Sequence, residues 1–171
     1  MFGKWVRESK ISSCFLTVLR LLLGYTFLTA GFHKLSANGF DASEFLKGAI
    51  ANPVKGPEDE VLYGWWVSFL KEFALPNIDI FNTIVPIGEF LIGLGLILGC
   101  LTTAAAFFAL VMNFSFLLSG TVSSNPRDII LGAIILFAGF NAGRYGLDYW
   151  IIPYIRKTVF KQADNIARKV G

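Results

Sequence analysis

Charged residues are scarce in this chain of 171 residues: only 16% are Asp, Glu, Lys or Arg, whereas 54% are apolar. An average soluble domain carries about 25% charged residues. The mean hydropathy of +0.60 is correspondingly high. The 15 basic residues are scattered along the chain, unlike the clustered basic patch of a nucleic-acid-binding protein. The composition therefore predicts a membrane protein with no nucleic-acid partner.

Metal-ligating and disulfide-forming residues are also few. The chain has one histidine, His33, and two cysteines, Cys14 and Cys100. Metal and haem sites usually need several nitrogen or sulfur ligands, and the sequence has no metal, haem or flavin motif. We therefore expect no metal site and leave the cofactor unknown. The two cysteines are too far apart in sequence for a disulfide framework, although a thiol pair that senses oxidants is an alternative.

Four apolar stretches are each long enough to cross a bilayer core, which takes about 20 helical residues. They cover residues 14–35, 80–99, 101–120 and 129–145. The sequence thus predicts an all-α protein, a four-helix transmembrane bundle in a single domain of residues 1–171. Glycine stripes in the first two helices, with Gly24 and Gly31 in one and Gly88 and Gly95 in the other, would let these helices pack closely.

Lys and Arg gather near the two ends of the chain. Three lie before the first predicted helix and five in the tail of residues 154–171, whereas residues 38–79 contain seven Asp and Glu and only three Lys. Because cytoplasmic segments of membrane proteins carry an excess of Lys and Arg, both termini are predicted to be cytoplasmic. The basic tail would bind anionic lipid or a partner protein.

The segment of residues 40–75 is expected to be an amphipathic outer segment. Apolar and aromatic side chains recur in it at helical spacing: Leu62, Trp65, Trp66, Phe69, Leu70 and Phe73. Two roles stay open for this aromatic face. It lies in the headgroup region and only anchors the protein, or it covers a site in the bundle.

Two charged residues lie well inside the predicted spans, away from the ends of the spans, although a charge at the centre of a membrane helix costs about 2.5–3.5 kcal/mol. Arg20 is in the first helix and Glu89 is near the middle of the second. We predict that these candidate catalytic residues form an ion pair. The alternative is a buried pair that only fixes the register of the helices. Asn113 and Asn141 are expected near the same centre, as interhelical hydrogen-bonding groups or substrate contacts.

Asn-Pro-Val-Lys-Gly at residues 52–56 and Met-Asn-Phe at residues 112–114 resemble the Gram-positive branch of the DoxX/DoxD family of small four-helix membrane proteins. Three further patterns in order along the chain resemble the family as a whole. They are Arg20-x3-Gly24-x6-Gly31-x2-Lys34, Gly88-Glu89-x3-Gly93-x-Gly95, and Ala-Gly-Arg-Tyr-Gly-Leu-Asp at residues 142–148. The family takes its name from a membrane subunit linked to a terminal quinol oxidase and to thiosulfate:quinone oxidoreductase. Other members are associated with quinone and thiol stress. The resemblance implies a multi-pass protein of a bacterial cell membrane.

The resemblance further implies redox work at or near the quinone pool, with Arg20, Glu89 and Lys34 as the residues that match the family pattern. We therefore expect a quinone-linked oxidoreductase or its quinone-binding membrane subunit, with a soluble redox partner on either face. A quinone site needs aromatic walls and hydrogen-bond donors. The candidate substrate-binding residues are Lys34, His33, Asn113, Asn141, Trp65 and Trp66.

Two other functions remain open. A non-catalytic anchor or assembly subunit of a redox complex would equally lack a redox centre of its own. A small-solute transporter would use Glu89 as a proton relay, although the sequence shows no inverted repeat. Whether the chain is itself an enzyme is left open, and His33 is either an interfacial residue or a proton-exchanging group.

Overall fold

The computed structural model describes residues 1–36 and 39–158, and they confirm the predicted all-α class. Within these residues there is no β-sheet, only a single bridge between Lys55 and Val61. The elements are α1 (Phe2–Glu8), α2 (Lys10–Ser36), α3 (Ser43–Ala51), α4 (Gly64–Phe69), the π-helical turn η1 (Leu70–Ala74), α5 (Ile78–Leu98), α6 (Thr102–Leu118), α7 (Asn125–Ala138) and α8 (Phe140–Gly143). Residues 148–158 are helical as well. Part of the predicted basic tail, residues 159–171, lies outside the described residues.

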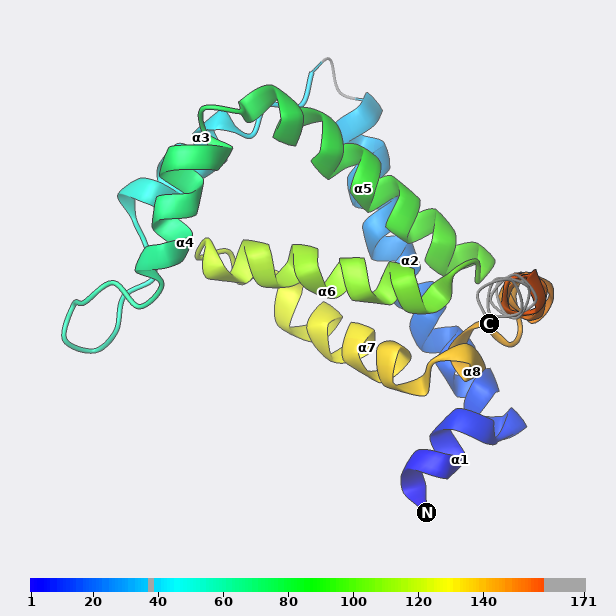
Figure 1. Ribbon diagram of the computed structural model, residues 1–171. Coiled ribbons are helices and arrows are strands. Elements are labelled where there is room, and N and C mark those ends of the chain that lie inside the picture. Colours follow the sequence, from blue (N-terminus) through cyan, green and yellow to red (C-terminus); the bar gives the residue numbers. More distant parts are fainter. Residues whose placement is uncertain (37–38, 159–171) are drawn as a thin grey trace, which may run out of the picture.

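Four helices form the body of the molecule as two packed pairs. The most extensive contacts join α2 to α5 and α6 to α7, and further contacts join the pairs through α5 with α6 and α2 with α7. Figure 1 shows α3 and α4 at one end of this body, and α1 and α8 at the opposite end. Both connections, from α5 to α6 and from α6 to α7, are short. After its turn α7 lies along α6, whereas α5 and α6 diverge from the turn that joins them (Figure 1).

The lengths of the helices differ from the four predicted spans. In the described part of the chain, α2 with 27 residues and α5 with 21 are long and apolar enough to cross a membrane, while α6 is apolar but has 17 residues. The fourth predicted span is wrong in its second half, because Gly139 has φ 59° and ψ −132° and ends α7. With 14 residues, α7 is only about 21 Å long. The bundle therefore consists of two long helices and two shorter ones.

Glycines set the close approach of α2 and α5. A side chain at Gly31 would meet the backbone of Phe90, and one at Gly93 would meet the backbone of Leu28. A Cβ at Gly24 would lie 3.0 Å from the Cβ of Leu96. The predicted role of glycine is confirmed at Gly24 and Gly31. Since the helices touch at the backbone, their antiparallel register is fixed.

The outer segment folds into a small apolar core of its own. Leu46 and Ala49 of α3 pack with Leu70 and Ala74 of η1, and all four are buried. Partly buried aromatic residues, including Phe81 of α5, surround this core. The segment is therefore attached to the body along α5, which places its aromatic side chains beside the helices.

Large apolar side chains are exposed on the outside of the body. They include Phe15 and Leu22 on α2, Leu91 on α5 and Phe108 on α6, each more than half exposed. An exposed apolar surface of this extent is typical of helices that contact lipid. The surface thus agrees with the composition in indicating a membrane protein.

Candidate functional site

A cavity of about 990 Å³ lies between α5, α6 and the outer segment. Its walls are mostly aromatic and aliphatic, and they include Phe40, Phe45, Trp66, Phe69, Met112 and Phe116. Small polar side chains line the part formed by the end of α6 and the loop after it: Ser115, Ser119, Thr121, Ser123 and Asn125. A cavity of this size with apolar walls and a few polar groups is typical of a small-molecule site.

Lys34 is the charged residue that lines this cavity, and it forms an ion pair with Glu89. Glu89 is only 3% exposed, whereas the Lys34 side chain is 27% exposed. The Lys34 ammonium also lies 5.3 Å from the ring centroid of Phe40 and 5.6 Å from that of Phe116. Aromatic faces attract a cation at such distances. The pair thus presents one partly accessible ammonium to an otherwise apolar chamber.

One carboxylate oxygen of Glu89 accepts the hydrogen bond from Lys34, and the other is buried without a protein partner. A buried polar atom that lacks a hydrogen bond is costly. Because Glu89 is not among the residues that line the cavity, this oxygen does not face the cavity, and Lys34 is the group of the pair that does.

The predicted ion pair between Arg20 and Glu89 is wrong. Along the antiparallel pair, Gly31 lies against Phe90 and Gly24 against Ile97, so Arg20 reaches the far end of α5. The 14 positions from Arg20 to Lys34 correspond to about 21 Å along the axis of α2. Periodicity places Arg20 on the same face of α2 as Gly24 and Gly31, but it carries no information on the register between α2 and α5.

Arg20 instead belongs to a structural cluster where α5 turns into α6. Its side chain is 2% exposed and donates a hydrogen bond to the carbonyl of Tyr145 over 3.2 Å. A Cβ at Gly146 would lie 2.5 Å from its guanidinium. Nearby, the buried carboxylate of Asp148 accepts hydrogen bonds from the amides of Leu101 at 2.6 Å and Thr102 at 2.9 Å. Such a carboxylate satisfies the free amides at the start of α6.

Of the other predicted site residues, some line the cavity and some lie elsewhere. Trp66 lines the cavity and its indole donates to the Ser119 hydroxyl over 3.0 Å. Trp65, 65% exposed, and His33, also exposed, do not line it. Asn113 is buried and donates to the carbonyl of Ala109 in its own helix.

Asn141 lies at the opposite end of the molecule from the cavity. Its amide donates to the carbonyls of Val6 and Ser9 at 2.8 and 3.0 Å, and so secures the end of α1. The structure therefore brings Lys34, Glu89 and Trp66 to one site, and gives Arg20 and Asn141 packing contacts elsewhere.

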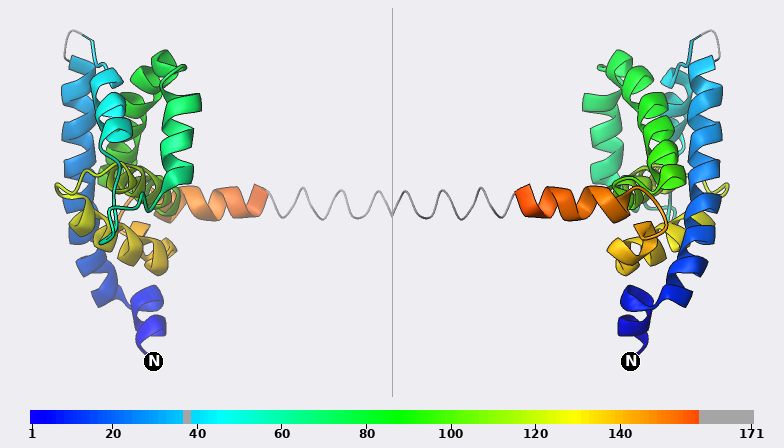
Figure 2. Two further views of the ribbon diagram at one scale, coloured as in Figure 1. Left: turned by 90° about the vertical axis from the view of Figure 1, so that its left-hand side faces the viewer. Right: turned by 90° about the vertical axis from the view of Figure 1, so that its right-hand side faces the viewer.

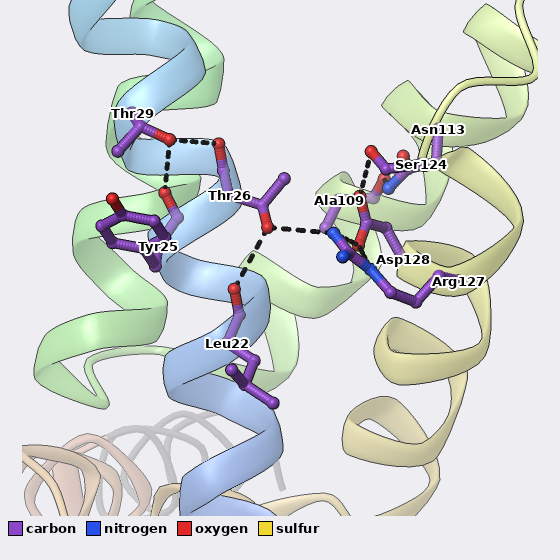
Figure 3. Close-up of polar contacts among 9 residues, drawn as sticks. All are labelled: Leu22, Tyr25, Thr26, Thr29, Ala109, Asn113, Ser124, Arg127 and Asp128. Carbon is purple, nitrogen blue, oxygen red and sulfur yellow. Dashed lines mark hydrogen bonds and ion pairs between the residues drawn. The ribbon is translucent and has the colours of Figure 1, made fainter.

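Sequence reasoning missed a polar cluster at the start of α7 (Figure 3). Asp128 is 1% exposed and accepts hydrogen bonds from the Ser124 hydroxyl at 2.8 Å and from Arg127. Arg127 also reaches Thr26 of α2 at 3.3 Å, so this cluster joins α7 to α2. Both charged residues precede position 129, where the fourth helix was predicted to begin. An Asn-Pro pair at 125–126 is the signal for the earlier start, since proline favours the first turn of a helix.

Metal-ligating side chains do not gather in the described part of the chain: no group of three or more His, Cys, Asp or Glu residues could hold an ion there. Cys14 is exposed and Cys100 is half-buried, and both are free thiols.

Comparison with known proteins gives one match. The family model described as DoxX matches residues 15–120. These residues include Lys34, Glu89 and nearly all of the cavity wall, but neither Asp128 nor Asp148. No curated protein and no solved structure matches the chain.

Proposed function

The chain belongs to the DoxX family, and from this premise we propose that it is a quinone-binding membrane protein that works with a separate redox partner. The observation that carries the proposal is the apolar cavity of about 990 Å³ with the Lys34–Glu89 pair at its edge. The family resemblance supplies the link to the quinone pool. The cavity supplies a place for the ring.

The chemistry of a quinone matches the walls of this cavity. The ring is flat and apolar, so it packs well between aromatic side chains such as Phe69 and Phe116. Each carbonyl oxygen needs a hydrogen-bond donor, and the Lys34 ammonium has three N–H groups, of which Glu89 occupies one. Lys34 would therefore hold one carbonyl oxygen while the ring contacts the aromatic wall.

Reduction of a quinone to a quinol takes two electrons and two protons. In the proposal the electrons come from a partner protein or a thiol donor. Glu89 would serve as the proton reservoir and act through Lys34, because Lys34 lines the cavity and shares a hydrogen bond with Glu89, and a buried carboxyl group is suited to general acid–base work. Lys34 would then position the ring and balance the charge of Glu89.

The proposal is tested by binding of a short-chain quinone to the purified chain in lipid nanodiscs. Quenching of tryptophan fluorescence gives the dissociation constant, because Trp66 lines the cavity. Wild type is expected to bind saturably, and Lys34→Gln at least tenfold more weakly. Lys47→Gln, a change of an exposed lysine on α3, is the matched control and should bind as wild type does.

Two results would overturn the proposal: no saturable binding to the wild-type chain, or equal affinity of Lys34→Gln and Lys47→Gln. The first result favours the alternative of a non-catalytic anchor or assembly subunit. If the bound quinone is reduced when a reductant is added, the reaction is measured directly by the loss of the quinone's ultraviolet absorbance.

A further inference from the structure

The helix of residues 148–158 crosses the direction of α2 and α5 (Figure 2). It is held at its start, where the amides of Leu147 and Asp148 donate to the carbonyls of Leu98 and Gly99 at 3.1 and 2.7 Å. The helix therefore leaves the body from the end of α5 and extends sideways. A helix in this direction, in a chain whose long helices span the membrane, lies along the membrane rather than across it.

The side chains on this helix have the composition of a membrane interface. Tyr149, Trp150 and Tyr154 are 55%, 66% and 73% exposed. Arg156 and Lys157 follow and are exposed too. Tyr and Trp are enriched at the level of the lipid headgroups, and adjacent cations attract anionic lipid.

The short helix α1 lies at a different level along α2. Arg20 of α2 lies beside Gly99 and Gly146, next to the start of the helix of residues 148–158, whereas α1 ends at Glu8, before α2 begins. The ten positions from Lys10 to Arg20 correspond to about 15 Å along the axis of α2. Arg7 of α1 is engaged with the body, because it donates to the carbonyl of Phe137 over 3.0 Å. The helix of residues 148–158 therefore presents its surface without α1 (Figure 2).

We propose that residues 148–158 form a docking surface for the headgroups of anionic phospholipids. Charge complementarity carries the choice of lipid. The helix exposes two cations, Arg156 and Lys157, and no acid, because its single carboxylate, Asp148, is 2% exposed and engaged with α6. The aromatic side chains enter the headgroup layer, and the cations bind phosphate groups.

The first test measures thermal unfolding in nanodiscs as phosphatidylglycerol replaces phosphatidylcholine. Wild type should unfold at a higher temperature with phosphatidylglycerol. The variant Arg156→Gln/Lys157→Gln should lose at least half of this rise. The control Lys47→Gln/Lys55→Gln removes two exposed cations from the outer segment at the other end and should keep the full rise.

The second test locates Trp150 in the membrane without altering charge. The difference in fluorescence between wild type and Trp150→Phe isolates the emission of Trp150. Lipids brominated close to the headgroup should quench this emission more than lipids brominated deep in the acyl chain. The proposal is overturned if bromolipids of both kinds leave it unquenched, which would mean that the surface faces water or a soluble partner. It is also overturned if the two double variants keep the same response to phosphatidylglycerol.

Discussion

Buried charges in this chain are accommodated in two different ways. Glu89 pairs with Lys34, which remains in contact with the cavity. Arg20 has a backbone carbonyl as its hydrogen-bond acceptor and lies close to glycines at the turn between α5 and α6. The first arrangement leaves the Lys34 ammonium accessible from the cavity, and the second serves the packing of helix ends. Arg20 and Glu89 both match the family pattern, yet only Glu89 pairs with a residue of the cavity wall.

The first prediction concerns the energetic coupling of Lys34 and Glu89. Lys34→Gln should lower the free energy of unfolding by about 3 kcal/mol, because it leaves the charge of Glu89 buried without a partner. Glu89→Gln should lower it by less, because Lys34 is 27% exposed at the cavity. The double variant should be more stable than the sum of the two losses predicts, by about 1 kcal/mol or more. Reversible unfolding in mixed micelles, followed by circular dichroism, measures all three values.

The control for this cycle is the pair Arg20 and Glu89. Arg20→Lys and Glu89→Gln should act additively within about 0.5 kcal/mol, because the side chains lie far apart and share no partner. A coupling as large as that of Lys34 with Glu89 would contradict the arrangement described here, and would restore the ion pair first expected from the sequence.

At the scale of elements, the long apolar runs predict the bounds of α2, α5 and α6 with errors of at most a few residues, because such runs are a strong signal. The prediction failed at α7, where the apolar run continues through Gly139 although the backbone turns there. The break depends on a backbone conformation that glycine permits but does not enforce. An apolar run alone therefore overstated the length of the fourth helix.

The candidate site was predictable only in part, because it depends on how separate elements pack against one another. Lys34 and Glu89 were both singled out as residues, but their pairing depends on the register of α2 against α5. Trp66 was named from its helical spacing, whereas its contact with Ser119 depends on how the outer segment folds back onto α6. Contacts of this kind arise from tertiary packing, and a single sequence carries no direct signal for them.

The second prediction belongs to the contact between α2 and α5. Gly93→Ala should destabilise the protein by at least about 1 kcal/mol, because the new Cβ would overlap the backbone of Leu28. The control is Gly48→Ala in α3, where a Cβ would have no neighbour within 4 Å. That change should be neutral or stabilising, since alanine favours a helix over glycine. Thermal unfolding of both variants in the same detergent gives the comparison, and equal shifts would rule out backbone contact at Gly93.

The whole molecule has an uneven distribution of charge between its two ends. The outer segment with α3 and α4 contains six of the 12 acidic residues, whereas α1 and residues 148–158 expose four cations and one acid. In a membrane protein this difference governs orientation, because segments rich in Lys and Arg stay on the cytoplasmic side. The helix of residues 148–158, which is proposed to bind anionic lipid, would therefore also contribute to the topology.

The third prediction tests that orientation in cells. In a Cys14→Ser/Cys100→Ser background, Glu58→Cys places a thiol in the exposed loop before α4, and Arg156→Cys places one on the helix of residues 148–158. A membrane-impermeant maleimide should label the first variant in intact cells, and the second only after the cells are permeabilised. Labelling of Arg156→Cys in intact cells would show that the topology is the opposite of the one predicted. The basic surface would then face the outside, where the lipid-docking proposal would require anionic lipid in the outer leaflet.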